Sequence, residues 1–126
     1  MPRLAAAALA VALLAGCVAD DPADAPSHPD VVDATLERDG EAWRVSATLS
    51  SSYDSPDRYA DAWRVVAPDG TVLGVRELLH DHAGEQPFTR SLDGVEIPSD
   101  VDEVTVEGRD SANGWGGVTV TVDVPS

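Results

Sequence analysis

The chain has 126 residues and a formal net charge of −15 at pH 7, with 23 acidic residues against 8 basic ones and no lysine. A surface of this sign repels the phosphates of DNA, RNA and anionic lipid headgroups, so nucleic-acid binding is excluded. The same field favours cationic ligands and metal ions, although high acidity also serves solubility or adaptation to salt.

The N-terminus has the pattern of an export signal. Arg3 precedes an uncharged apolar run over residues 4–15, which is shorter than the ~20 residues needed to cross a bilayer core. The run ends in Leu14-Ala15-Gly16-Cys17, which resembles the lipobox of bacterial lipoproteins. The resemblance implies that residues 1–16 are a signal peptide and that Cys17 becomes the lipidated first residue of the mature chain. The alternative is an ordinary signal peptide, in which Cys17 is incidental.

Cys17 is the only cysteine, so the exported domain has no internal disulfide and depends on its apolar core. Two or more acyl chains, such as palmitate, anchor a protein stably, since each buried methylene contributes roughly 0.8 kcal/mol. We therefore expect the membrane to be a partner through the N-terminal lipid. The expected location is the extracytoplasmic side of the cell envelope, meaning the outer membrane or periplasmic side in a Gram-negative host.

The mature chain divides into a tether and one domain. Residues 17–30, the lipidated cysteine followed by a stretch rich in proline and acidic residues, are predicted to form a disordered tether. Beyond it, apolar and polar residues alternate with period two, and Asp-Gly and Asn-Gly turns separate the runs. This predicts an all-β, immunoglobulin-like β-sandwich of about seven antiparallel strands over residues 31–126. The expected strands are 31–38, 42–50, 60–67, 72–80, 87–92, 102–109 and 117–124.

The alternation also predicts which side chains form the core. Trp63 lies on the third strand, where such sandwiches often bury a tryptophan. The side chains expected to be mostly buried are Trp43, Val45, Leu49, Trp63, Val65, Leu79, Phe88, Val104, Val106, Val120 and Val122.

Three loops are predicted to meet at one end of the sandwich, because successive antiparallel strands alternate in direction. These are 51–59, 81–86 and 110–116, and immunoglobulin-like folds commonly bind through loops gathered at one end. Trp115, in the last of these loops, is a candidate for contact with a ligand; the alternative is that it packs over the glycines of its hairpin. The acidic residues at positions 54, 57 and 61 do not have the Asp-x-Asp-x-Asp-Gly order of a calcium-binding loop. A solvated acidic loop is therefore the favoured interpretation. The candidate ligand-binding residues are Tyr53, Tyr59, Asp61 and Trp115.

The two histidines His80 and His82 suggest a metal site. Residues two apart on a strand point the same way, roughly 6.5–7 Å apart, so two imidazoles could share one Zn²⁺ or Cu²⁺ ion. Glu85 is the candidate third ligand, leaving a fourth position open for water. The alternative is that the strand ends at His80 and both histidines only cap a polar turn.

A second resemblance covers roughly residues 59–117. The segment Leu78-Leu79-His80-x-His82-x-x-Glu85-Gln86-Pro87-Phe88-Thr89-Arg90 is its most specific part, flanked by Tyr59-Ala60-Asp61-x-Trp63-x-Val65 and Gly114-Trp115-Gly116-Gly117. These segments resemble a small group of uncharacterised exported bacterial proteins. The resemblance implies a family pattern around the histidines and carries no activity with it.

Catalytic signatures are not recognisable in the sequence: it has no Gly-x-Ser-x-Gly elbow and no phosphate-cradling glycine loop. The pattern favours a lipid-anchored, extracytoplasmic binding module of unknown ligand, with a divalent metal as one candidate, over an enzyme. The alternatives are a small metal-dependent enzyme that uses His80, His82 and Glu85 to activate water, and a structural or interaction protein that contacts another envelope protein.

Overall fold

A computed structural model describes residues 27–126, so the lipobox, its Cys17 and most of the predicted tether lie outside the described residues. The described part is all β, as predicted, and contains no helix that could span a membrane. The seven strands are β1 (Asp30–Asp39), β2 (Ala42–Ser50), β3 (Ala60–Val66), β4 (Val72–Glu77), β5 (Phe88–Val95), β6 (Glu103–Asp110) and β7 (Gly114–Asp123).

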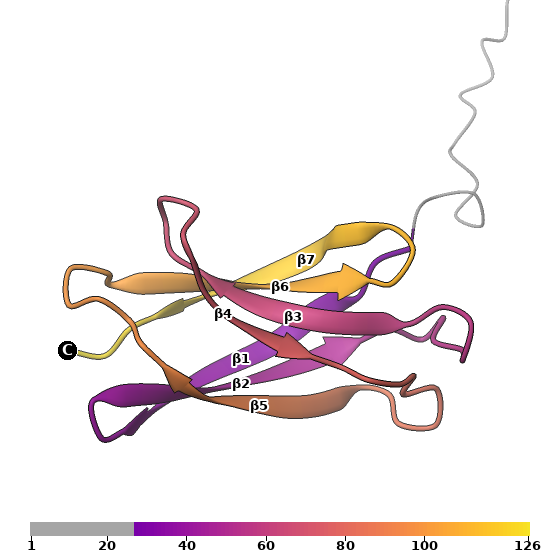
Figure 1. Cartoon of the computed structure of the whole chain (residues 1–126), viewed down its shortest axis with the longest axis horizontal. Coiled ribbons are helices and arrows are strands. Elements are labelled where there is room, and N and C mark those ends of the chain that lie inside the picture. The colour runs from indigo at the N-terminus through magenta and orange to yellow at the C-terminus, as the bar shows by residue number, and fades with distance from the viewer. Residues whose placement is uncertain (1–26) are drawn as a thin grey trace, which may run out of the picture.

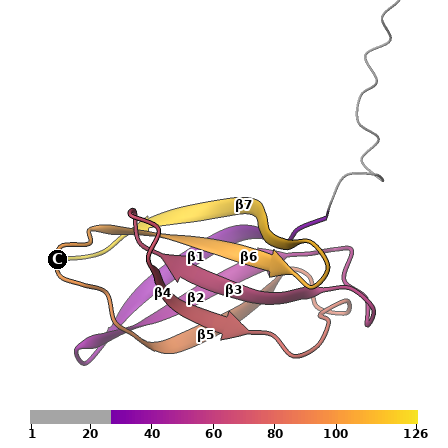
Figure 2. The ribbon, with the colours of Figure 1, turned by 45° about the horizontal axis from the view of Figure 1, so that its top comes forward.

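The strands form two antiparallel sheets stacked as a sandwich (Figures 1 and 2). One sheet has the order β1-β2-β5 and the other the order β4-β3-β6-β7. In the constant-type immunoglobulin arrangement the fourth strand belongs to the sheet of the first, second and fifth strands. Here β4 pairs with β3 instead, so the edges of the two sheets, β4 and β5, lie beside each other.

The core between the sheets contains most of the predicted side chains. Trp63, Val45 and Leu49 have no exposed surface, and Val120 and Val122 are partly buried against the core. The prediction for Leu79 was wrong, because this side chain is 84% exposed and Leu78 is buried in its place. The predicted side chains that are buried are Trp43, Val45, Leu49, Trp63, Val65, Phe88, Val104 and Val106.

Residues 27–30, which the prediction included in the tether, lie against the domain. Pro29 is fully buried, and a Cβ added at Gly117 would collide with its carbonyl oxygen. The Asp30 carboxylate accepts the backbone N–H of Val118 at 2.9 Å. Because glycine has no side chain, the glycines of the β6–β7 hairpin allow the backbone of residues 27–30 to lie close to the backbone of the hairpin.

The three loops β2–β3, β4–β5 and β6–β7 lie at one end of the sandwich, as predicted, and the N-terminal segment enters at the same end (Figure 1). The Ser27 carbonyl oxygen accepts hydrogen bonds there from Arg58 Nη2 at 3.1 Å and Asn113 Nδ2 at 3.0 Å.

Candidate functional site

Asp54 joins the β2–β3 loop to the β4–β5 loop. Its side chain is buried, with Oδ1 accepting the N–H of Ala60 at 3.1 Å and Oδ2 accepting the N–H of His82 at 2.9 Å. Gln86 strengthens the junction: Oε1 accepts the N–H of Ser51 at 2.7 Å, and Nε2 donates to the His82 carbonyl oxygen at 3.0 Å. Asp54, considered above as part of a solvated acidic loop, is therefore a buried acceptor that holds two loops together.

Asp110 plays the same role between the β2–β3 and β6–β7 loops. Its fully buried carboxylate accepts the N–H groups of Asn113 at 2.8 Å and Ala112 at 3.0 Å, and Arg58 Nε donates to it at 3.2 Å. Burial alone would raise the pKa of Asp110, but the nearby Tyr53 hydroxyl and these donors outweigh burial and lower it. Tyr53 Oη is buried near this carboxylate without meeting hydrogen-bond geometry, and burial followed by Asp110 strongly raises the pKa of Tyr53.

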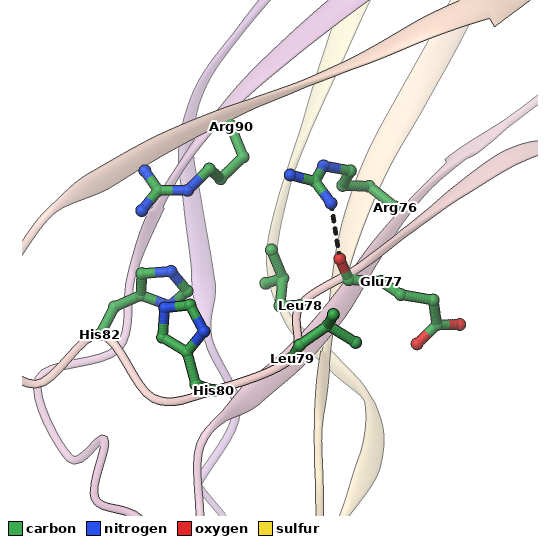
Figure 3. Close-up of a pocket in the computed structure, with 7 residues that line it drawn as sticks. All are labelled: Arg76, Glu77, Leu78, Leu79, His80, His82 and Arg90. Atoms are coloured by element: carbon green, nitrogen blue, oxygen red, sulfur yellow. Dashed lines mark hydrogen bonds between the residues drawn. The ribbon is translucent and has the colours of Figure 1, made fainter.

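A small pocket of about 140 Å³ opens where β4 ends and passes β5 (Figure 3). Nitrogen-bearing side chains dominate its wall, and the acidic side chain among the lining residues, Glu77, points away from the histidines in Figure 3. The lining residues are Arg76, Glu77, Leu78, Leu79, His80, His82 and Arg90.

His82 is the buried member of this wall, with 5% of its surface exposed. Its ring stacks on Phe88 with centroids 4.0 Å apart, and the His80 ring lies 4.9 Å away on a tilted plane. Burial, followed by the charges of Arg90 and His80, lowers the pKa of His82. The buried imidazole is thus neutral at pH 7, and its Nδ1 has no hydrogen-bond partner among residues 27–126.

The predicted metal ligands are only partly brought together. His80 and His82 lie on a loop, since β4 ends at Glu77, so the expectation of two histidines spaced along a strand was wrong. Glu85 is engaged elsewhere, in an ion pair of 2.9 Å with Arg90. Within residues 27–126, no group of three or more His, Cys, Asp or Glu side chains is placed to hold a metal ion. Metal binding through His80, His82 and Glu85 stays a prediction.

The four predicted ligand-binding residues do not line this pocket. Tyr59 pairs its backbone with Ser111, and Asp61 accepts a hydrogen bond from Arg109 at 2.7 Å. Trp115 lies on β7 with the guanidinium groups of Arg64 and Arg109 at 4.0 and 5.1 Å from its ring centroid. Each of these residues, like Tyr53, thus contributes to contacts within the domain, and a role in ligand binding stays a prediction.

The sequence analysis assigned no role to the two arginines of the pocket, although Arg90 is the last residue of the segment around the histidines that resembles other exported proteins. Arg76 comes from β4 and Arg90 from β5, two strands in different sheets, so no spacing along the chain could place them together. One available signal was scarcity: the whole chain has only 8 basic residues, and these two flank the histidines on either side.

Comparison with known proteins gives one informative relative. A protein of Halomicrobium mukohataei named "Putative lipoprotein" is 44% identical over 98 residues, which cover 77% of this chain. The matched part is 48% of that protein, so the chain spans about half the length of the relative. No protein-family model and no solved structure matches the chain.

Proposed function

We propose that this protein is a lipid-anchored, extracytoplasmic binding module that holds its ligand in the pocket formed by the β4–β5 loop. The observation that carries the proposal is a preformed pocket whose loop is fixed from outside by the buried Asp54 carboxylate. Loops fixed on a rigid sandwich are a common arrangement for binding, because little ordering is needed when the ligand arrives.

Two observations support the anchor. The segment Leu14-Ala15-Gly16-Cys17 resembles a lipobox, and the relative from Halomicrobium mukohataei is named as a lipoprotein. An anchor at Cys17 and the entry of the chain beside the pocket end would keep the site near the membrane surface.

Mass spectrometry of the protein purified from membranes tests the anchor. The expected result is a chain that starts at Cys17 and carries acyl chains, and Cys17→Ser should abolish the acylation and release any cleaved protein from the membrane fraction. Ser50→Ala, a conservative change far from the N-terminus, is a control that should stay in the membrane. An unmodified native N-terminus at another residue would overturn the anchor.

A metal ion is the second candidate ligand, favoured by the 4.9 Å separation of the two imidazole rings. The positive charges of Arg76 and Arg90 in the same pocket oppose it. Calorimetry with Zn²⁺ and Cu²⁺ tests this candidate. Binding that disappears in both His80→Ala and His82→Ala, but persists in His28→Ala, would support a metal site, and a metal-dependent enzyme would additionally require an open coordination position.

A further inference from the structure

Arg76 is unusual among the arginines of the described residues. Five of them form ion pairs with carboxylates, whereas Arg38 and Arg76 have no carboxylate of residues 27–126 within 4.0 Å. The guanidinium of Arg38 instead lies 4.5 Å from the ring centroid of Trp43. Arg76 lines the pocket, so an uncompensated positive charge lies in the pocket wall of a strongly acidic protein.

Neutral backbone groups hold this guanidinium in place. Nε donates to the Ser91 carbonyl oxygen at 3.0 Å. Nη1 donates to the Glu77 carbonyl oxygen at 2.8 Å, the bond that is dashed in Figure 3. The bond to Ser91 ties the edge of β4 to the edge of β5, and within the described part of the chain the charge has no carboxylate partner. Nη2 takes part in none of the hydrogen bonds of the described residues, so donors remain for a ligand on a side chain that is already ordered.

Two acidic side chains near the pocket are already paired with arginines. The Glu77 carboxylate accepts a hydrogen bond from Arg109 at 3.1 Å, and the Glu85 carboxylate pairs with Arg90 at 2.9 Å. Arg76 is therefore the arginine of the pocket wall whose charge has no carboxylate partner among residues 27–126.

The apolar part of the wall limits what can bind. Leu78 and Leu79 line the pocket beside the cationic groups, and Leu79 is 84% exposed. Contact between Leu79 and an aliphatic group of a ligand would remove apolar surface from water and so favour binding. A volume of about 140 Å³ admits only a small molecule, and the net charge of −15 penalises each additional negative charge on it.

We infer that this pocket binds a small organic monocarboxylate, whose carboxylate pairs with Arg76 and whose aliphatic part covers Leu79. The two oxygens of a planar carboxylate match the forked N–H donors of a guanidinium group. An ammonium group, which is a point charge, offers a carboxylate no such matching geometry. The inference deepens the proposed function and rests on its claim that the module binds a ligand at this end.

Calorimetry with isovalerate tests the inference, using the chain from Val18 onwards, which retains every described residue. Isovalerate should give a saturable heat, and the neutral isostere isovaleramide should give none. Arg76→Gln should weaken isovalerate binding about tenfold or more, as expected for the loss of a charge-assisted hydrogen bond. Arg38→Gln removes the other unpaired arginine and should leave the affinity unchanged.

Leu79→Ser is a second variant that does not endanger the fold, because the side chain is exposed. It should weaken isovalerate binding about threefold or more through the loss of apolar contact. Equal binding of isovalerate and isovaleramide, tighter binding of inorganic phosphate than of isovalerate, equal losses in Arg76→Gln and Arg38→Gln, or binding of Zn²⁺ without isovalerate would overturn the inference. Because acylation of Cys17 is measured separately, a failure here leaves the anchor standing.

Discussion

The Asp54 carboxylate accepts the backbone N–H of His82 at 2.9 Å, across 28 residues of sequence. This bond connects the β2–β3 loop, which does not line the pocket, to the β4–β5 loop, which forms part of its wall. Because the same carboxylate also accepts the N–H of Ala60 at the start of β3, the position of His82 is fixed relative to the sheet. The shape of the pocket therefore depends on a residue outside it.

Replacing Asp54 with Ala should lower the free energy of unfolding by about 2 kcal/mol or more, since two buried N–H groups lose their acceptor. Asp54→Asn retains one carbonyl oxygen and should cost less. Urea unfolding followed by tryptophan fluorescence measures both. Asp57→Ala removes an exposed acid from the same loop and serves as the control; an equal loss of stability in Asp57→Ala would mean that the carboxylate of Asp54 has no special role.

Gly117→Ala should destabilise the domain more than Gly114→Ala does. Both glycines have a positive φ, +85° and +79°, so both substitutions incur the backbone strain of roughly 1–2 kcal/mol. Only at Gly117 would the added methyl group meet the Pro29 carbonyl oxygen, whereas nothing lies within 4 Å at Gly114. Thermal unfolding of the two variants measures the difference, and equal melting temperatures would show that the docking of residues 27–30 contributes nothing.

Acidification should remove stability in two separate windows. The pKa of His82 lies below its ordinary value of 6.5, so the unfolded chain takes up a proton before the folded one, and stability falls as the pH drops from about 6.5 towards the lowered value. The groups facing His82 are Arg90, His80, Asp54 and Glu85. The pKa of Asp110 is also lowered, so its contribution is lost only at acidic pH, below its ordinary value of 3.8.

The pH dependence can be assigned with His82→Phe, which keeps a flat ring to stack on Phe88 at the observed 4.0 Å. Its melting temperature should be flatter than that of the wild type just below pH 6.5 and should still fall below pH 3.8. Differential scanning calorimetry between pH 8 and pH 3 measures the melting temperatures of the wild type and of His82→Phe at each pH. A wild type whose stability rises between pH 7 and pH 5, by an amount that His82→Phe abolishes, would contradict the neutral assignment of His82.

Trp63→Ala should cost about 3–5 kcal/mol, the range for deleting a large buried aromatic side chain. Trp63 has no exposed surface, whereas Trp115, on the same sheet, is partly exposed and lies over Arg64. Trp115→Ala should therefore cost clearly less. Urea unfolding of both variants, followed by circular dichroism, makes the comparison, and a Trp115→Ala cost equal to or above that of Trp63→Ala would be inconsistent with the observed core.

The strands could be predicted because their signal is local. Alternation of apolar and polar residues located all seven, including β3, where Trp63 and Val65 face the core. At Leu78 and Leu79 the prediction failed, because two adjacent leucines fit either phase of the alternation. β4 ends at Glu77, which buries Leu78 and exposes Leu79.

The candidate site was predicted less well than the fold, because it depends on contacts between strands of different sheets. The loops were correctly placed at one end, since their order follows from antiparallel topology alone. The meeting of Arg76 with Arg90 and the histidines requires the pairing of β4 with β3, and no pattern along the chain specifies that pairing. Likewise, the sequence contains many acidic residues and does not specify which of them pairs with Arg90. The ion pair between Arg90 and Glu85 could therefore not be predicted.

The most direct test of a binding site at this end is a map of backbone amide chemical shifts in the chain from Val18 onwards, titrated with isovalerate. Saturable shifts are expected only in residues 76–82 and 90–91, around Arg76, with little change in residues 97–102 at the opposite end. No saturable shift, or shifts centred on residues 97–102, would contradict it.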